Sequence, residues 1–158
     1  MNYLLIGGAE TVGKSETIFR LANNLISRGF TLIAGTIPAS FNDFRCILEG
    51  VDSHKNKIKI IINSPSDTVP IINDFKKFFD DNGSTYDIVI SSVRDDDFYP
   101  RNDFFRIMNI NPLKNFVLEI PLAKITRRGA NFTTALNWYQ NQIDILIDHT
   151  LQNRPYNL

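Results

Sequence analysis

The sequence is poor in residues that could hold a fold together by disulfides or bound metal. It contains one cysteine, Cys46, among 158 residues, so no disulfide can form within the chain and no cysteine-based zinc site can be built from it. The two histidines, His54 and His149, lie far apart and lack metal-ligand spacing. A chain of this length can bury a core without such links. We therefore expect one domain, residues 1–158, stabilised by packing alone.

The sequence also lacks an excess of either charge and any long apolar run. Its 17 Lys and Arg residues balance 17 Asp and Glu residues, which disfavours a globally basic nucleic-acid-binding protein. No run approaches the ~20 apolar residues that span a bilayer. The first apolar run, Tyr3–Ile6, is short and has no basic residue before it, unlike a signal peptide. We expect a cytoplasmic protein with no membrane or nucleic-acid partner, and its oligomeric state stays open.

Short apolar runs alternate with helical patterns along the chain, which is typical of βαβ units and of a parallel sheet covered by helices on both faces. The predicted strands are Tyr3–Ile6, Thr31–Ala34, Ile58–Ile62, Asp87–Ser91 and Asn115–Ile120. The predicted helices are Lys14–Arg28, Thr68–Phe79, Asn102–Met108 and Phe132–Leu151. A further strand-like run, Phe44–Glu49, predicts a β-hairpin near residues 44–62. The expected fold is α/β, a three-layer α/β/α sandwich with a mainly parallel sheet of about five strands.

The last predicted helix also has a set of side chains expected to pack on the body of the protein, although the helix Lys14–Arg28 has the clearest apolar stripe. Its apolar residues at helical spacing are Leu136, Tyr139, Ile143, Leu146 and Ile147. Trp138, on the same helix, is most simply explained as a packing residue.

One motif in the chain points to specific chemistry. Residues 8–15 read Gly-Ala-Glu-Thr-Val-Gly-Lys-Ser, which fits the pattern G-x-x-x-x-G-K-[ST] at every fixed position. Gly8 and Gly13 allow backbone conformations that a β-carbon would block, so successive N–H groups can surround an anion at the start of the following helix. Lys14 can reach the β- and γ-phosphates of a nucleotide, and the Ser15 hydroxyl can hold Mg²⁺. The pattern and its position between a strand and a helix predict a phosphate-binding loop.

At these residues the sequence resembles the P-loop NTPase superfamily, and its small size is most similar to the nucleotide-kinase-like branch. The resemblance implies that the chain is a single nucleotide-binding domain that binds ATP or GTP with Mg²⁺. The implied chemistry is phosphoryl transfer to a small acceptor, or hydrolysis. The implied roles are phosphate binding by the loop, charge neutralisation and catalysis by the lysine, and metal ligation by the serine. The loop residues concerned are Gly8, Ala9, Glu10, Thr11, Val12, Gly13, Lys14 and Ser15.

The sequence departs from the family pattern at the Walker B acid, an aspartate expected at the end of a buried strand. Ser91 and Ser92 stand there in the predicted strand near residue 90. Asp67 and Asp43 are candidate replacements as magnesium ligands, although Asp67 suits an N-cap of the next helix equally well. The carboxylate of Glu10 would also repel phosphates unless it turns outward. These departures motivate an alternative, a regulatory or assembly protein that binds a nucleotide without turnover.

Other candidate residues follow later strands. Arg94 directly leaves a predicted strand at the edge where α/β sheets bind ligands, which makes it a candidate catalytic residue. Kinase-like P-loop proteins often place arginines after late elements against the adenine and the phosphates. Arg127 and Arg128 are therefore candidate nucleotide ligands, with an exposed basic turn as the alternative. A small acceptor is expected near residues 36–49, where Asp43 and Arg45 stand among aromatic residues.

Overall fold

A computed structural model describes residues 1–95, 99–125 and 132–158. Its strands are β1 (Asn2–Gly7), β2 (Thr31–Gly35), β3 (Arg45–Val51), β4 (Lys57–Asn63), β5 (Ile88–Val93) and β6 (Phe116–Pro121). Its helices are α1 (Lys14–Ser27), α2 (Val69–Asp81), α3 (Tyr99–Ile107) and α4 (Phe132–Gln152). The α/β class, the alternation of strands and helices, and the hairpin formed by β3 and β4 are confirmed.

The strands form one six-stranded sheet in the order β2-β3-β4-β5-β1-β6. The pairs β4–β5, β5–β1 and β1–β6 are parallel, whereas β3 runs antiparallel to both of its neighbours. Strand β2 therefore runs in the same direction as the parallel set, and β3 alone is reversed. The sheet is mainly parallel, as expected, and the hairpin strand brings the number of strands to six instead of about five.

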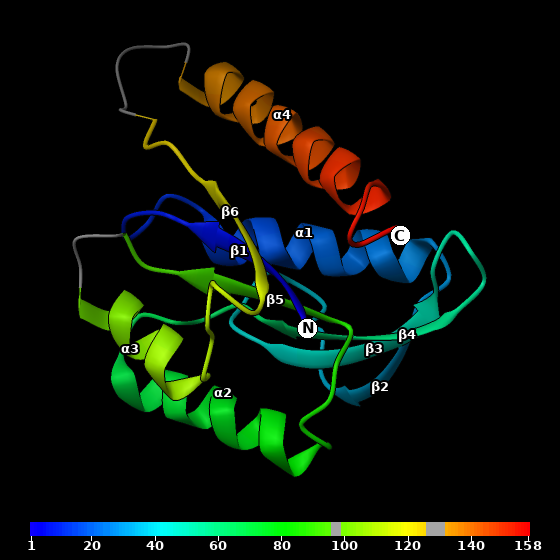
Figure 1. Ribbon diagram of the computed structural model, residues 1–158. Coiled ribbons are helices and arrows are strands. Elements are labelled where there is room, and N and C mark those ends of the chain that lie inside the picture. Colours follow the sequence, from blue (N-terminus) through cyan, green and yellow to red (C-terminus); the bar gives the residue numbers. More distant parts are fainter. Residues whose placement is uncertain (96–98, 126–131) are drawn as a thin grey trace.

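The helices cover the sheet in two layers (Figure 1). Helices α1 and α4 lie on one face, and α2 and α3 lie on the other. Alternate side chains of β1 enter the two cores: Leu4 and Ile6 pack on the α1 side, and Tyr3 and Leu5 pack on the α2 side. All four are essentially buried. A central strand that is buried on both faces explains why its sequence reads as a continuous apolar run.

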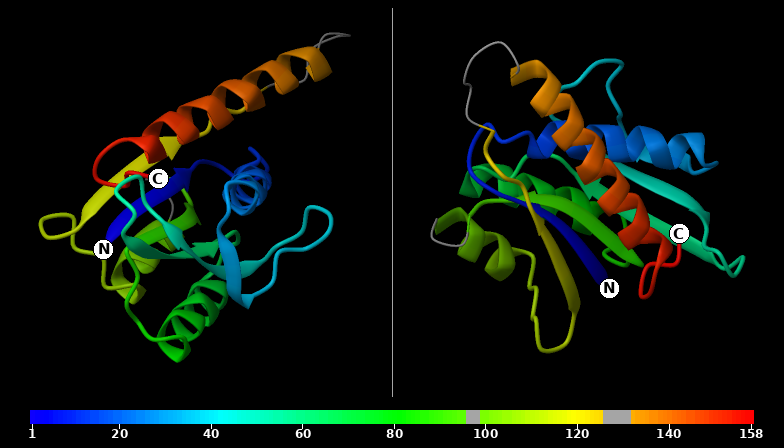
Figure 2. Two further views of the ribbon diagram at one scale, coloured as in Figure 1. Left: turned by 90° about the vertical axis from the view of Figure 1, so that its right-hand side faces the viewer. Right: turned by 90° about the horizontal axis from the view of Figure 1, so that it is seen from above.

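Helix α4 buries a narrower face than its sequence pattern predicts. Ile143 and Ile147 are buried as expected, but Leu146 is 47% exposed and Trp138 is 65% exposed. The first turns of α4 extend past the sheet (Figure 2), so the side chains there have little to pack against. Contact with α1 holds the rest of the helix, and Arg20 pairs with Asp144 at 2.8 Å. The expectation that Leu146 and Trp138 are packing residues is wrong.

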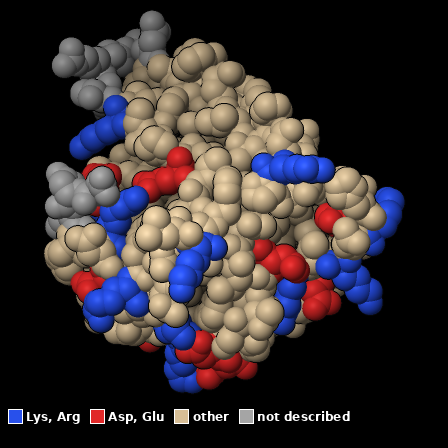
Figure 3. Space-filling view, in the orientation of Figure 1, with Lys and Arg blue, Asp and Glu red and all other residues tan. Residues whose placement is uncertain are grey.

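The surface in the view of Figure 3 carries both charges. Lys and Arg alternate with Asp and Glu over α2 and α3, and the part over α4 is almost free of charged side chains. Within the described residues, no helix is both long and apolar enough to cross a membrane.

The parallel strands bring several loops to one edge of the sheet. The loop from Gly8 to Gly13 follows β1, the segment Ser64–Thr68 follows β4, and Arg94 follows β5. Thr36 follows β2 at the same edge. Open α/β sheets bind ligands at the carboxyl ends of their parallel strands, so this edge is where a functional site is sought.

The end of β2 lies very close to the backbone of β3 at Gly35. A substitution of Gly35 therefore tests this part of the fold. Gly35 has φ +76°, and a β-carbon there would lie 2.2 Å from the carbonyl oxygen of Arg45. Gly29 has a similar φ of +97°, but a β-carbon there would have no neighbour within 4 Å. We expect Gly29→Ala to lower the free energy of unfolding by about 1–2 kcal/mol, through backbone strain alone. Gly35→Ala should cost about 1–3 kcal/mol more, because of the overlap.

Urea unfolding of the two variants and the wild type measures this difference. Equal costs for the two substitutions would show that β2 does not approach β3 as closely as described.

Candidate functional site

The loop between β1 and α1 turns sharply at two glycines. Gly8 has φ +140°, and a β-carbon there would lie 2.9 Å from Val12 Cγ2 and 3.1 Å from the carbonyl oxygen of Leu122. Gly13, with φ +96°, occupies the N-cap position of α1 and offers no side chain to cap it. Both positions therefore require glycine for their backbone conformation.

The backbone N–H groups of the loop and of the first helical turn are available to a ligand. Within the described part of the chain, none of the N–H groups of residues 9–16 donates a hydrogen bond. The first turn of any helix leaves such donors without intrahelical partners, and the helix dipole adds positive potential there. This combination suits an anion such as a phosphate group.

Lys14 is buried beneath this loop. Its Nζ donates hydrogen bonds to the carbonyl oxygens of Gly8 at 2.9 Å and Ala9 at 2.7 Å. Burial lowers the pKa of Lys14, and the negative charge of Asp67 is the largest effect that opposes this. The ammonium group is thus positioned by loop carbonyls.

Ser15 lies beside the carboxyl end of β4. Its Oγ donates to the carbonyl oxygen of Ser64 at 3.1 Å, and the Ser64 hydroxyl accepts a hydrogen bond from the backbone N–H of Phe44. Ser91 and Ser92 are instead buried within β5, where Ser91 accepts from Asn63 and Ser92 bonds to Ser66.

A cavity of about 330 Å³ lies against the loop and this strand end, and is called the phosphate cavity below. Its lining residues are Thr11, Gly13, Lys14, Ser15, Glu16, Phe41 and Asp67. Asp67 forms an ion pair with Arg94 at 3.0 Å. The positive charge of Arg94 also acts on Lys14. The structure therefore brings together four candidates from three separate parts of the sequence, namely Lys14 and Ser15, Asp67, and Arg94.

The alternative role of Asp67 as a helix cap does not agree with the structure. Thr68 occupies the N-cap position of α2, and no side chain caps this end of the helix. The carboxylate of Asp67 is half exposed and points to Arg94 instead. Asp67 therefore pairs with Arg94 and does not cap α2.

A second cavity, of about 240 Å³, lies on the other side of the same loop. It shares Thr11, Gly13 and Glu16 with the phosphate cavity and is otherwise bounded by the end of β6 and by α4. Its apolar walls include Leu122 and Ile143. Tyr139 accepts a hydrogen bond from the backbone N–H of Ala123 at 2.6 Å, and Gln140 donates to Glu16 at 3.3 Å. The lining thus combines apolar side chains with a few polar groups held by hydrogen bonds, and such combinations occur in sites for small organic ligands.

The remaining predicted residues have different positions. Glu10 is exposed and does not line the phosphate cavity, so its carboxylate turns outward. Asp43 lines a separate neighbouring cavity together with Arg45. Arg127 and Arg128 lie outside the described residues.

The oxygen donors of the phosphate cavity suit a magnesium ion. In the part of the chain that is described, no three His, Cys, Asp or Glu side chains converge on one point. The Ser15 hydroxyl and the Asp67 carboxylate line the same cavity, and oxygen ligands are those that Mg²⁺ prefers. A protein that binds Mg²⁺ mainly through nucleotide phosphates needs only one or two such groups.

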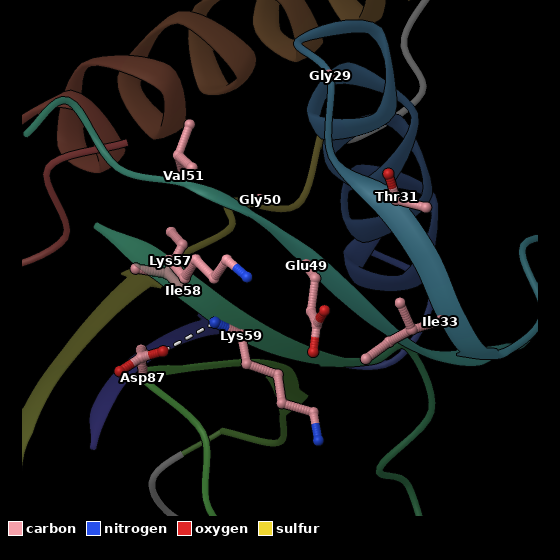
Figure 4. A pocket seen from close by; sticks show the side chains of 10 residues that line it. All are labelled: Gly29, Thr31, Ile33, Glu49, Gly50, Val51, Lys57, Ile58, Lys59 and Asp87. Carbon is pink, nitrogen blue, oxygen red and sulfur yellow. Dashed lines mark hydrogen bonds between the residues drawn. The ribbon is translucent and has the colours of Figure 1, made fainter. Parts of the chain in front are cut away.

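A larger hollow, of about 620 Å³, lies at the other end of the sheet (Figure 4). It opens over the edge formed by β2, β3 and β4, where Glu49 and Lys57 are exposed and Lys59 is half-buried. Asp87 accepts a hydrogen bond from the backbone N–H of Lys59 at 2.7 Å. This hollow lies at the amino ends of the parallel strands, away from the loop and Lys14, and its size alone does not make it the functional site.

The sequence pointed to Asp67 after this strand, but not to the contact between Ser15 and the carbonyl of Ser64. The available signal was the set of polar residues that follows the apolar strand, namely Asn63, Ser64, Ser66 and Asp67. The end of β5, where the family pattern has its acid, carries the buried Ser91 and Ser92.

Comparison of the chain with protein-family models, curated proteins and solved structures gives no significant match.

The geometry around Lys14 predicts how its pKa responds to Asp67. Replacing Asp67 with asparagine removes the main negative charge that favours the ammonium form of Lys14. The Lys14 pKa should therefore fall further in Asp67→Asn. Asp81→Asn is the matched control, because Asp81 pairs with Lys77 on the exposed side of α2.

NMR titration of ¹³C-labelled lysine side chains measures the pKa directly. An unchanged or raised Lys14 pKa in Asp67→Asn would contradict the described position of the Asp67 carboxylate.

Proposed function

We propose that the protein binds a nucleoside triphosphate, ATP or GTP, through the loop between β1 and α1. The observation that carries this proposal is a buried lysine beneath a loop whose backbone N–H groups have no partner among the described residues. Bound phosphates would accept hydrogen bonds from those N–H groups. They would also give the Lys14 ammonium a charged partner in place of two carbonyl oxygens. Both changes favour a polyanion over a neutral ligand.

The two cavities beside the loop support a division of the nucleotide between them. The phosphate cavity contains Lys14, Ser15 and Asp67, and the second cavity combines apolar side chains such as Leu122, Leu136 and Ile143 with polar ones. The phosphates would lie in the phosphate cavity and the base in the second cavity. The nucleotide would pass between them at Gly13 and Glu16, which line both cavities. Ser15 and Asp67 would supply oxygen ligands for Mg²⁺, directly or through water. Asp43 is less suited, because it lines a different cavity.

The chemistry that this arrangement supports best is transfer of the terminal phosphoryl group to a small acceptor or to water. Loop amides and Lys14 would stabilise the charge of the transferring group. Arg94 would add a second positive charge near the same point, since its guanidinium acts on Lys14.

Binding without turnover is the second candidate, and one observation favours it. The group beside Ser15 at the end of β4 is a backbone carbonyl, and the Asp67 carboxylate, which lines the same cavity, is already paired with Arg94. A protein of this kind would change its surface or its partners when nucleotide binds, with no chemical step.

Lys14 provides the first test of nucleotide binding. Lys14→Ala should weaken ATP or GTP affinity about 100-fold or more, because two charge-assisted contacts of about 1.5–3 kcal/mol each are lost. The urea midpoint should change little, since the ammonium bonds only to loop carbonyls. Lys57→Ala, at the other end of the sheet, is the matched control and should bind like the wild type.

Calorimetric titration of ATP, GTP and a non-hydrolysable analogue, with and without Mg²⁺, measures these affinities. If Lys14→Ala binds as tightly as the wild type, or if the wild type binds neither nucleotide, the assignment of the loop is wrong.

Two variants distinguish Asp67 from Asp43 as the magnesium ligand, through the effect of Mg²⁺ on nucleotide affinity. In Asp67→Asn, the gain in nucleotide affinity that Mg²⁺ gives should shrink about 10-fold or more, as when an outer ligand of a metal site is lost. Asp43→Asn should leave that gain unchanged, because Asp43 lines the other cavity. The reverse pattern would move the metal site away from β4.

Release of phosphate by the purified protein separates the two candidate functions. Mg²⁺-dependent release that is lost in Lys14→Ala supports phosphoryl transfer or hydrolysis. Tight binding with no release, even with acceptors present, supports the binding protein.

A further inference from the structure

The outward side of α4 carries three large apolar side chains. Trp138, Ile145 and Leu146 are 65%, 55% and 47% exposed. Residues seven and eight positions apart lie on the same side of a helix, so these three belong to one face. Single exposed apolar side chains are common on protein surfaces, whereas several on one face, with a tryptophan among them, are typical of an interaction surface.

The same face has no acidic or basic side chain. Within α4, the only Asp, Glu, Lys or Arg residues are Asp144 and Asp148. Both turn toward α1, where Asp144 pairs with Arg20 and Asp148 accepts a hydrogen bond from Asn24 at 3.3 Å. The surface over α4 is accordingly almost free of charge (Figure 3). A solvated helix face is normally charged, whereas the core of an interface is depleted in charged residues.

The first half of α4 has few apolar contacts with the rest of the chain. The buried residues of the helix lie between Ile143 and Leu151, in its second half, and its first turns extend past the sheet (Figure 2). On the inner side of these turns, Leu136, Tyr139 and Gln140 line the second cavity. A partner on the outward face would add contacts where the helix has fewest, and would also support that wall of the cavity.

The outward residues are spaced as in a contact between two helices. Ala135, Trp138, Gln142, Ile145 and His149 are all exposed and follow one another in steps of three and four residues, which keeps side chains facing a second helix. Their order is also complementary to its own reverse. In two antiparallel copies centred on Gln142, the large Trp138 would lie beside Ile145 of the other copy and the small Ala135 beside His149. The two Gln142 amides would meet, and each can donate and accept a hydrogen bond.

We infer that α4 is the surface through which two copies of this chain associate, with their α4 helices antiparallel across a two-fold axis near Gln142. An uncharged face can meet its own copy without repulsion between like charges. A charged partner surface would instead lose water there and gain no counter-charge. A lipid surface is less suitable, because helices that lie on membranes carry Lys and Arg, which α4 lacks.

The size of this face determines the strength of the contact. Helix α4 has 21 residues and is about 31 Å long. An aromatic side chain buries roughly 150–250 Å², so the 65% exposed Trp138 side chains of two copies would together lose roughly 200–300 Å² of accessible surface. Stable specific interfaces bury about 1,200–2,000 Å² in total. One helix from each copy is near the lower end of this range, so we expect a dimer with a micromolar dissociation constant.

Analytical ultracentrifugation of the purified chain at increasing concentration measures this association. The wild type should pass from monomer to dimer. Trp138→Ala should raise the dissociation constant about 30-fold or more, as when a central interface tryptophan is truncated. Ile145→Lys should weaken the dimer similarly, because it places like charges on both copies at the contact. Ile33→Lys is the matched control, since Ile33 is 44% exposed on β2, at the sheet edge opposite β6, and it should dimerise like the wild type.

A cysteine at the two-fold axis tests the antiparallel arrangement. The one native cysteine, Cys46, is fully buried and does not compete in the folded protein. Under mild oxidation, Gln142→Cys should form a disulfide between two copies, because both Gln142 positions lie near the axis. Ala135→Cys lies on the same face, but the two Ala135 positions would be about 21 Å apart along the helices, beyond the reach of a disulfide.

The outcomes are independent of ATP and GTP, so nucleotide binding is tested separately. A wild type that stays monomeric up to about 1 mM, or a dimer that Trp138→Ala and Ile145→Lys leave unchanged, would overturn the inference. Equal cross-linking of Gln142→Cys and Ala135→Cys would overturn the antiparallel arrangement. Co-sedimentation of a monomeric protein with vesicles of phosphatidylcholine and phosphatidylglycerol would overturn self-association and assign the face to a lipid surface. Urea midpoints close to that of the wild type would confirm that the variants are folded.

Discussion

The pairing of β1 with β5 and β6 is the constraint on which the rest of the structure depends. Both pairings are parallel, and β1 is buried on both faces, so its direction sets the direction of its neighbours. Parallel strands end at one edge, which places the loop after β1 beside the segments that follow β4 and β5. This edge brings the candidate-site residues together, and hydrogen bonds and an ion pair then fix their side chains. Without this pairing, Lys14 would lie apart from Asp67 and Arg94, even if its own hydrogen bonds to Gly8 and Ala9 were kept.

Burial of Lys14 couples the loop to charges on other elements. A buried ammonium is unfavourable unless acceptors and negative charge compensate it. Two loop carbonyls and Asp67 supply this compensation, and Arg94 in turn pairs with Asp67. Positive and negative side chains thus alternate in the site, in the order Lys14, Asp67 and Arg94. Phosphates would replace the carbonyls as partners of Lys14 and compete with Asp67 for Arg94, which would allow the carboxylate to turn to a metal ion. The ion pair of Asp67 and Arg94 is therefore consistent with a binding site, and does not need to be explained as a surface contact.

The sequence predicted the local parts of this fold better than their arrangement. The apolar runs, the hairpin and the turn at Gly8 and Gly13 follow from local rules and appear where expected. The order of the strands does not follow from such rules, because it depends on which apolar faces meet. The contact between Ser15 and Ser64, between residues 49 positions apart, was for that reason missed. Likewise, the pattern of α4 showed which residues are apolar, but not that its first turns extend past the sheet, and Leu146 and Trp138 were misplaced.

The end of β4 supports two polar contacts that lie far apart in the sequence. The carbonyl of Ser64 accepts a hydrogen bond from Ser15, and Asn63 accepts one from Arg45, whose guanidinium also donates to the Ile71 carbonyl of α2. One strand end thus positions both the first turn of α1 and the guanidinium of Arg45. Groups held by strands keep their geometry more precisely than groups on loops. A substitution that shifts the end of β4 would therefore disturb both contacts together.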